Sequence, residues 1–428
     1  KQLLQIFERL MPNPAEGNPP VFLKGEGEDA EEVVVKPNPD EHAIGHVFHV
    51  DIDAFKGKLG VFRLHQGTIK SGGQLFVGDA RKPIKVNQLL KLNGGDHGKV
   101  EVALPGDICA IPRVDEVHYD AVLHDSHDED HFHLKSIELP RPMFGLAISP
   151  PSDNEAQKTS DALHTAESED PSLTVEHNAA LNEVVLRGLG EMHLRTVLQE
   201  IEDRYDLEVN TAPPSIAYRE TIRGKAEGHH RHKKQTGGAG QFGEVYLRVE
   251  PLPSGEGFEF ASEVVGGAIP SQYIPAVETG VRQVMDSGGV HGYPMQDIKV
   301  IVYDGKHHSV DSKEIAFIQA GKKAFMDAVE KARPILMEPI VSVAVTVPSD
   351  CAGGVAGDLS SMRGMISGTE TLPDNRIVVS GQAPLKEIQA YHSRLKSLTG
   401  GEGSFTMDFS HYAEVSPDLL DERERRTA

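Results

Sequence analysis

Alternating apolar and polar residues dominate the first third of the chain and favour short β-strands over helices. The segments HAIGHVFHVDID, GKLGVFRLHQGTIKSGGQLFVG and PGDICAIPRV are separated by turn residues and have no helical period. This pattern predicts a small β-barrel over residues 21–140. Ahead of the barrel, a proline-rich linker ends at residue 20 and follows a predicted helix with an apolar face formed by Leu3, Leu4, Phe7 and Leu10.

Residues 141–212 have a different pattern, in which strands alternate with helices. The segments FGLAISP, LTVEH, EVVLRG and LEVNTA predict strands. Helices are expected over residues 153–167, with Ser152 as the N-cap, and over residues 190–204. The resulting order, β-α-β-β-α-β, is that of a ferredoxin-like fold.

Residues 334–428 repeat this order, with helices expected over 355–362 and 385–398. Residues 213–333 lie between the two ferredoxin-like units and predict a mixed α/β unit. Its long helix is expected over 312–331, because Asp311-Ser-Lys-Glu314 has the spacing of a capping box. The predicted fold class is therefore multidomain α+β: a β-barrel, a ferredoxin-like βαββαβ unit, a mixed α/β domain and a second ferredoxin-like unit.

Composition agrees with a soluble globular protein, since 38% of the 428 residues are hydrophobic and 25% are charged. No apolar run approaches the roughly 20 residues that span a bilayer. The two cysteines, Cys109 and Cys351, are far apart in the sequence and suggest a reducing compartment. We therefore expect a cytoplasmic protein without membrane contact.

The formal net charge is -22, which on average repels nucleic acid. Residues 223–234 are an exception, with five cations, one anion and three histidines. We call these five cations the basic island: Arg223, Lys225, Arg231, Lys233 and Lys234. Such a cluster is either a solvated loop or a site for phosphates.

A G-x-G-x-x-G pattern at residues 238–243 adjoins this island. A dinucleotide-binding loop follows a buried strand and opens a helix. Here HHRHKKQT precedes the pattern, and EVYLRVE, with the alternation of a half-exposed strand, follows it. The context therefore excludes a dinucleotide site and indicates a basic loop that enters a strand, suited to RNA phosphates.

Three further motifs favour structural roles. Residues 93–100 resemble a P-loop but lack its first glycine and its Ser/Thr, so a hairpin turn is predicted. Residues 118–133 hold five histidines and five acids, and His131 and His133 would share a strand face. Their spacing matches no zinc pattern, which favours polar turns over a metal site. Residues 188–193 are interpreted as a strand-to-helix turn. No catalytic constellation is apparent.

Several longer motifs resemble bacterial elongation factor G, and the resemblance extends in order over essentially the whole chain. They include HKKQTGGAGQFG (232–243), GYPMQDIKV (292–300), YDGKHHSVDSKEIAF (303–317), LRGLGEMHL (186–194) and RLKSLTGGEGSFTMDF (394–409). The resemblance implies that residues 21–140, 141–212, 213–333 and 334–428 are the second to fifth domains of that family.

The resemblance also implies that two loops of the protruding fourth domain form a tip that contacts mRNA and tRNA at the ribosomal decoding region. His308 matches the family's tip histidine. Carried over to this chain, the tip consists of Lys233, Lys234, Gln235, Thr236, Gly237, Gly238, Ala239, Gly240, Gln241, Lys306, His307, His308, Ser309, Val310 and Asp311.

The GTPase motifs of the family do not occur in this sequence, and residues 3–14 resemble the last helix of its N-terminal GTPase domain. The chain is therefore expected to be a fragment in which residues 1–20 are the remnant of that domain and its linker. GTP and Mg²⁺ would belong to the missing domain, which leaves no catalytic, cofactor or metal residue here. The expected partners are ribosomal RNA and proteins, tRNA and mRNA, and the chain is expected to be a monomer.

The implied function is to promote movement of tRNA and mRNA while the missing domain hydrolyses GTP. Two departures leave a second possibility open. Ala239 stands where arginine is common, and His307 stands where an aromatic residue is common. A paralogue that acts in ribosome recycling, stress response or drug protection therefore stays an alternative. A metal- or nucleotide-dependent enzyme is a remote one.

Overall fold

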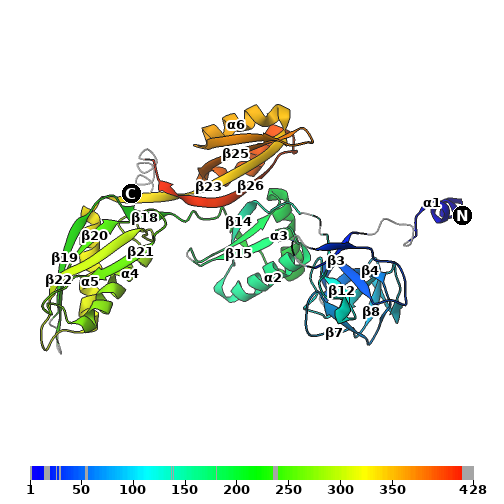
Figure 1. The fold of residues 1–428 in the computed structure, drawn as a ribbon, viewed down its shortest axis with the longest axis horizontal. Coiled ribbons are helices and arrows are strands. Elements are labelled where there is room, and N and C mark those ends of the chain that lie inside the picture. Colours follow the sequence, from blue (N-terminus) through cyan, green and yellow to red (C-terminus); the bar gives the residue numbers. More distant parts are fainter. Residues whose placement is uncertain are drawn as a thin grey trace. The chain divides into compact units, whose positions relative to one another are not determined.

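The computed structural model describes the chain apart from residues 1, 14–19, 26, 28–29, 54–55, 136, 138, 180, 235–239 and 417–428. The chain forms two compact units, residues 1–213 and 214–428, which are described one at a time (Figure 1). The predicted first helix is present as α1 (Gln2–Leu10).

A curled, barrel-like sheet forms the first part of the first unit, which confirms the predicted β-barrel. Its strand order is β7-β6-β12-β3-β4-β11-β8-β9. Apolar side chains such as Phe62, Leu64 and Ile111 fill its interior. The strands of this sheet are β3 (Ile44–Asp53), β4 (Gly57–Gln66), β6 (Gln74–Val77), β7 (Ile84–Lys85), β8 (Leu89–Asn93), β9 (Asp96–Val100), β11 (Ile108–Pro112) and β12 (Val122–His124).

The first unit also contains two small sheets. The P-loop-like residues 93–100 belong to a β-hairpin of the barrel sheet. Asn93 pairs with Asp96 across a two-glycine turn between β8 and β9, as the hairpin interpretation predicts. The small sheets are β13-β1-β2, from β1 (Phe22–Lys24), β2 (Glu31–Val33) and β13 (Phe132–Leu134), and β10-β5, from β5 (Ile69–Lys70) and β10 (Val102–Ala103).

The second part of this unit confirms the predicted ferredoxin-like topology, with strand order β15-β16-β14-β17. Leu163, Leu186 and Leu194 form part of its core. The elements are β14 (Phe144–Ser149), α2 (Ala156–Glu169), β15 (Thr174–Asn178), β16 (Glu183–Gly188), α3 (Glu191–Tyr205) and β17 (Asn210–Ala212).

The predicted N-cap of the first helix in this part is wrong. A single 3₁₀ turn, η3 (Asp153–Glu155), precedes α2, and Ser152 makes no capping hydrogen bond. Its hydroxyl instead donates to Glu155 Oε2 at 2.9 Å. The Ser152 hydroxyl thus acts as a donor to a side chain and accepts no hydrogen bond from a backbone N–H of the helix.

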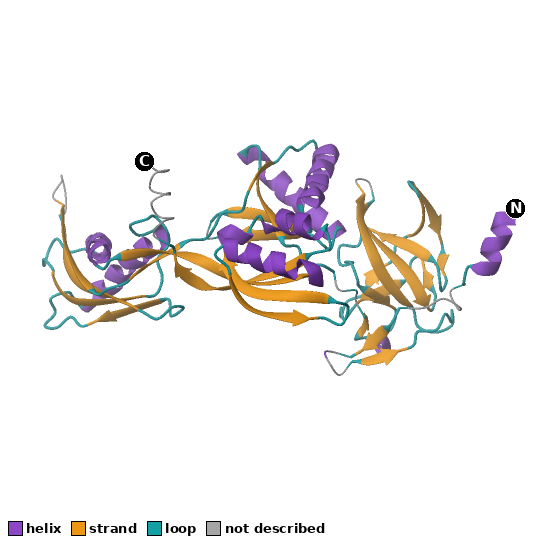
Figure 2. Cartoon of the chain, turned by 90° about the horizontal axis from the view of Figure 1, so that it is seen from above, coloured by secondary structure: helices purple, strands orange, loops and turns teal. Residues whose placement is uncertain are grey.

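In the second unit, residues 214–333 form the mixed α/β region, with strand order β19-β20-β22-β21. Helices α4 and α5 cover one face of this sheet (Figure 2). Val245, Leu247 and Val249 of β20 point to that face and pack with Phe317 and Phe325 of α5. The elements are β19 (Ala226–Lys234), β20 (Gln241–Pro251), β21 (Phe258–Ser262), η4 (Ser271–Tyr273), α4 (Ile274–Ser287), β22 (Ile298–Lys306) and α5 (Glu314–Lys331).

The capping-box prediction for α5 is wrong. The helix begins at Glu314, its N-cap is Lys313, and the Lys313 side chain makes no capping hydrogen bond. The Ser312 hydroxyl is used elsewhere, because it donates to the carbonyl oxygen of Phe242 at 2.9 Å. A tertiary contact thus competes successfully with the local one.

The last part of the chain confirms the second ferredoxin-like unit, with strand order β24-β25-β23-β26. The long strand β23 also pairs with β18 through Pro334–Met337. The elements are β18 (Arg219–Ile222), β23 (Pro334–Pro348), η5 (Ser349–Cys351), α6 (Ala352–Ser361), β24 (Met365–Thr371), β25 (Arg376–Pro384), α7 (Leu385–Ile388), α8 (Tyr391–Thr399) and β26 (Ser404–Glu414).

The prediction of a single helix over residues 385–398 is wrong, because the helix is interrupted between α7 and α8. Next to the break, the side-chain amide of Gln389 donates to the carbonyl oxygen of Pro214 at 2.6 Å. This partner lies far away in the sequence, so no local pattern could have revealed it.

Candidate RNA-contacting tip

Two segments that are far apart in the sequence meet at one end of the sheet in residues 214–333. One is the end of the β19–β20 hairpin, and the other is the loop between β22 and α5. The N–H of Phe242 donates to the carbonyl oxygen of Asp311 at 2.9 Å, and the Ser312 hydroxyl donates back to the Phe242 carbonyl. The His308 N–H donates to the Ser312 hydroxyl at 2.8 Å. These bonds join the two loops into one surface.

Part of the predicted tip falls on this surface. Lys233, Lys234, Gly240 and Gln241 lie at the hairpin end, and residues 306–311 form the other loop. A side chain at Gly240 would place its Cβ 2.8 Å from Asp311 Oδ1, so glycine allows the loops to approach each other. Five further residues of the predicted tip lie outside the described residues: Gln235, Thr236, Gly237, Gly238 and Ala239.

The two neighbouring histidines of the second loop have different roles. His308 Nδ1 lies 3.3 and 3.2 Å from the backbone N–H groups of Val310 and Asp311, which makes Nδ1 an acceptor. The ring proton therefore sits on Nε2. The His308 side chain is 53% exposed, so this N–H is available to a partner. His307 Nδ1 instead lies 3.2 Å from the Ala268 carbonyl and fixes its own loop.

Fewer cations of the basic island are free to bind phosphates than its sequence suggests. Its first three cations are paired with carboxylates: Arg223 with Glu414, Lys225 with Glu250 at 2.7 Å, and Arg231 with Glu244 at 3.0 Å. Among the described residues, Lys233 and Lys234 have no carboxylate within 4.0 Å. Two of the five cations are thus left for phosphates, and both lie at the hairpin end.

Glu244 is the residue that sequence analysis missed. It is only 1% exposed, yet it faces away from the helices, beneath Arg231 and His229. Burial raises the pKa of its carboxyl group, but hydrogen bonds from Arg231 and His229 more than offset this, so the pKa lies below its usual range. The strand alternation of β19 and β20 could have indicated this cross-strand charge cluster.

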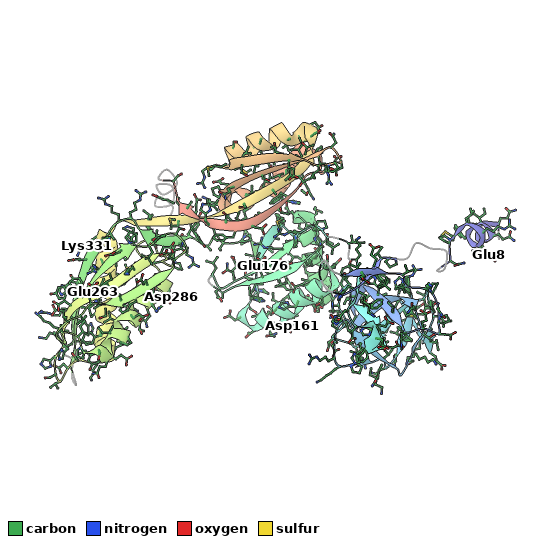
Figure 3. All side chains as sticks on the ribbon, viewed as in Figure 1. Glu8, Asp161, Glu176, Glu263, Asp286 and Lys331 are labelled. Atoms are coloured by element: carbon green, nitrogen blue, oxygen red, sulfur yellow. The ribbon has the colours of Figure 1, made fainter. Side chains whose placement is uncertain are left out.

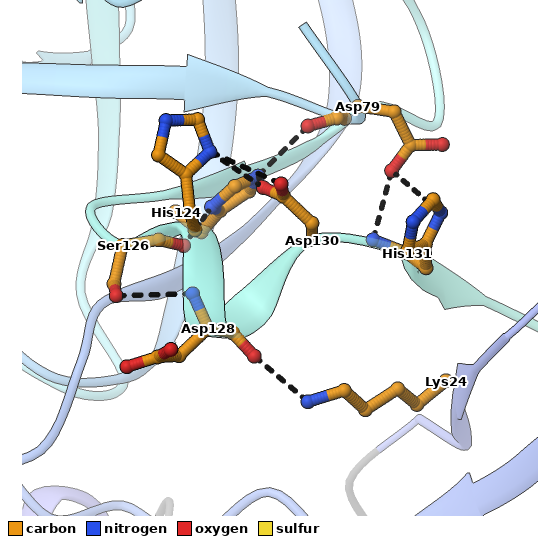
Figure 4. A network of polar contacts seen from close by, with 9 residues as sticks. Lys24, Asp79, His124, Ser126, Asp128, Asp130 and His131 are labelled. Atoms are coloured by element: carbon orange, nitrogen blue, oxygen red, sulfur yellow. Dashed lines mark hydrogen bonds and ion pairs between the residues drawn. The ribbon is translucent and has the colours of Figure 1, made fainter. Parts of the chain in front are cut away.

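The histidine-rich segment 118–133 is bound to the barrel by polar contacts (Figure 4). His124 lies between the carbonyl oxygens of Ser126 and Gly78, His127 pairs with Asp130 at 3.0 Å, and His131 lies 3.5 Å from Asp79. His131 occupies a turn with φ of 65°, so it does not share a strand face with His133 as predicted. The described residues contain no group of three or more side chains arranged to hold a metal ion.

The strand-to-helix turn at residues 188–193 is stabilised by hydrogen bonds to side chains of the same region. The N–H of Leu189 donates to His193 Nδ1 at 3.1 Å, and His193 Nε2 donates to Asp170 at 2.8 Å. The Leu189 N–H is therefore already used, and the Asp170 carboxylate nearby would repel an anion. Within the described part of the chain, no helix has the length and apolar character to cross a membrane.

Four family models match the chain in sequence order, and all describe domains of one protein. They are elongation factor G domain 2 (residues 42–121), domain III (139–213), domain IV (214–333) and the C-terminus (335–423). The chain belongs to the elongation factor G family. The tip described above lies within the region that matches domain IV of elongation factor G.

Comparisons with individual proteins agree with this family. The chain is 38% identical over 392 residues to elongation factor G of Aquifex pyrophilus, which covers 91% of the chain and 56% of that relative. A crystal structure of a protein from Thermus thermophilus matches with a TM-score of 0.79 and 34% identity, covering 100% of the chain and 61% of that structure's chain. The chain thus spans about three fifths of the length of these two relatives.

Proposed function

We propose that this chain is the ribosome-binding part of an elongation-factor-G-like translation factor that promotes movement of tRNA and mRNA. In the longer protein, a separate N-terminal domain would bind GTP with Mg²⁺ and hydrolyse the nucleotide. The chain itself would supply binding and positioning. The observation that carries the proposal is the joined pair of loops in the region that matches domain IV, which brings His308 to the end of the β19–β20 hairpin where Lys233 and Lys234 lie.

The chemistry of this surface suits RNA. The backbone of the glycine-rich loop and the Lys233 and Lys234 side chains would contact phosphates without regard to sequence. His308 Nε2–H and the Gln241 amide add directional hydrogen bonds. Contacts of this kind position a rigid element against RNA and do not transform it chemically, which agrees with hydrolysis in another domain.

The test is made in the full-length protein with the double variant His308→Ala/Gln241→Ala. Each lost hydrogen bond costs about 1 kcal/mol, so loss of both should slow tRNA–mRNA movement roughly 30-fold. Toeprinting measures movement, and release of phosphate measures ribosome-stimulated GTP hydrolysis on the same preparation. Hydrolysis should stay near the wild-type rate.

A matched control is His177→Ala/Gln157→Ala, which removes the same residue types at exposed positions outside residues 214–333. Equal loss of movement and hydrolysis in the tip variant would contradict the proposed separation of roles. An unchanged rate of movement would favour the paralogue. Complementation of a strain depleted of elongation factor G distinguishes a factor for movement from one for recycling, stress or drug protection.

A further inference from the structure

The face of the sheet β19-β20-β22-β21 that points away from α4 and α5 carries a row of aromatic side chains. His229 of β19 and Tyr246 of β20 are direct cross-strand neighbours, with ring centroids 4.0 Å apart and ring planes within 17°. Tyr303 of β22 follows, with its centroid 6.3 Å from that of Tyr246. We call His229, Tyr246 and Tyr303 the aromatic row.

The aromatic row lies next to the outer edge of the sheet, which α5 caps in part. The N–H of His229 donates to Asp327 Oδ2 at 3.0 Å, and Lys331 Nζ donates to the Glu227 carbonyl oxygen at 3.4 Å. β19 is the first strand in the order of this sheet, and the His229 side chain is 43% exposed. One ring face of His229 is covered by Tyr246, and β19 has no further strand beside it among the described residues. Flat rings with a free face are where nucleic-acid bases stack, because each base has a π-face of similar size.

The carboxylates around the row differ in their partners. Glu227 accepts a hydrogen bond from the Tyr303 hydroxyl at 3.2 Å and Asp304 is the cross-strand partner of Tyr246, and neither has a cationic side chain within 4.0 Å among the described residues. Glu244 is shared by Arg231 and His229, and the Tyr246 hydroxyl donates to it at 3.3 Å. Its negative charge is therefore neutralised beneath the rings. The pKa of the Tyr246 hydroxyl is raised by burial and by Glu244, so this tyrosine stays a neutral ring and a hydrogen-bond donor.

Charge on this face differs from one end to the other. At the end away from the tip, the ion pairs are internal: Arg248 with Glu263 at 2.8 Å and Lys299 with Glu259 at 2.6 Å (Glu263 is labelled in Figure 3). At the tip end, Lys233 and Lys306 have no carboxylate within 4.0 Å among the described residues. Phosphates that lead away from a base on His229 would meet these cations.

We propose that the aromatic row is a stacking site for an unpaired RNA base, beside the tip and distinct from it. The occupant is a single-stranded stretch of RNA whose base extends the His229–Tyr246 stack, while its phosphates approach Lys233 and Lys306. This inference rests on the proposed function in taking RNA as the partner, but its contact is a base rather than a backbone.

The experiment titrates the chain with an eight-nucleotide single-stranded RNA that contains one 2-aminopurine, whose fluorescence falls when it stacks. An unlabelled RNA duplex is the second probe, added as a competitor. The single strand should be quenched on binding, and the duplex should displace it at least tenfold more weakly than an unlabelled single strand does. Tyr246→Leu and His229→Ala should each weaken binding of the single strand at least tenfold, within the range measured for loss of one stacking contact. Tyr246→Phe keeps the ring and should restore the quenching.

Tyr119→Leu is the matched control, since Tyr119 is a partly exposed tyrosine of the barrel region, and it should bind like the wild type. Thermal unfolding of each variant separates loss of binding from loss of fold. Equal binding by wild type and Tyr246→Leu, equal loss in Tyr119→Leu, or equal competition by the duplex and the single strand would overturn the proposal.

Failure of this proposal can be distinguished from failure of the proposed function. Quenching that depends on Tyr246, in a full-length protein whose tip variants move tRNA and mRNA normally, would support the stacking site and reject the tip. Slowed movement in the tip variants without any quenching would support the tip and reject the stacking site.

Discussion

The two ends of the sheet in residues 214–333 handle polar groups in opposite ways. At the base, where β22 begins, Glu220 is fully buried and its Oε1 accepts hydrogen bonds from the N–H groups of His291 and Tyr293 at 3.0 and 2.8 Å. At the tip, Lys233 and Lys234 are exposed and the His308 side chain is 53% exposed.

This difference follows from the cost of desolvation. A buried polar group that lacks a partner costs several kcal/mol, so the base matches these two N–H donors within the chain, while Glu220 Oε2 is buried without a hydrogen-bond partner. Asp297 behaves similarly there, because it accepts hydrogen bonds from the N–H groups of Gly255 and Gly257. An exposed polar group remains hydrated at little cost. Polar groups at the tip can therefore be kept for a partner, whereas those at the base serve the fold.

The largest expected effect is a loss of stability when the hydrogen bonds at the base of the sheet are removed. Glu220→Ala leaves two buried N–H groups without an acceptor, at roughly 1–3 kcal/mol each, so we expect a loss of about 3 kcal/mol in the free energy of unfolding. Denaturant unfolding of the chain measures it. Glu220→Gln keeps the accepting oxygen and should lose less. A stability equal to that of the wild type in Glu220→Ala would show that the loop at residues 291–293 does not depend on this carboxylate.

A smaller effect sharpens the distinction between paired and unpaired cations. Lys233→Ala/Lys234→Ala removes two phosphate contacts, so the slope of log affinity for ribosomes against log salt should become shallower by about 1.5. Ribosome pelleting across a salt series measures the slope. Lys225→Ala is the matched control and should leave the slope unchanged, because Lys225 already pairs with Glu250. A similar change in both variants would mean that the ion pairs open on binding.

The smallest expected effect is on the loss of stability at low pH. The pKa of Glu244 in the folded protein lies below its usual range, although burial opposes this, because Arg231 and His229 donate hydrogen bonds to the carboxylate. Its contribution to stability is therefore fully present above the unfolded pKa of about 4.3 and is lost as pH falls through the lower folded pKa. Glu244→Gln should show a shallower loss of unfolding free energy below about pH 5 than the wild type.

Urea unfolding at a series of pH values tests this prediction. The control is the same substitution in an Arg231→Ala background, where Glu244 has lost its cation and Glu244→Gln should change the acid profile less. An identical change in both backgrounds would assign the effect to another group.

Local pattern in the sequence determined the elements and their order. Alternation in EVYLRVE predicts β20, and the order of strands and helices predicts both ferredoxin-like topologies, because the side-chain periods of strands and helices are set by backbone geometry. The same alternation excluded a dinucleotide loop at residues 238–243. The family resemblance came from longer motifs, which the four matching domain models confirm.

Tertiary structure alone decided which partner each polar side chain takes. Ser312 bonds to Phe242 rather than capping α5, Gln389 reaches Pro214 at the break between α7 and α8, and Arg231 is held by Glu244 instead of remaining free. Each of these residues has a local partner or solvent as an alternative of similar energy. A hydrogen bond contributes only about 1 kcal/mol net, so the packing of distant strands and helices, which the sequence does not display, determines the choice.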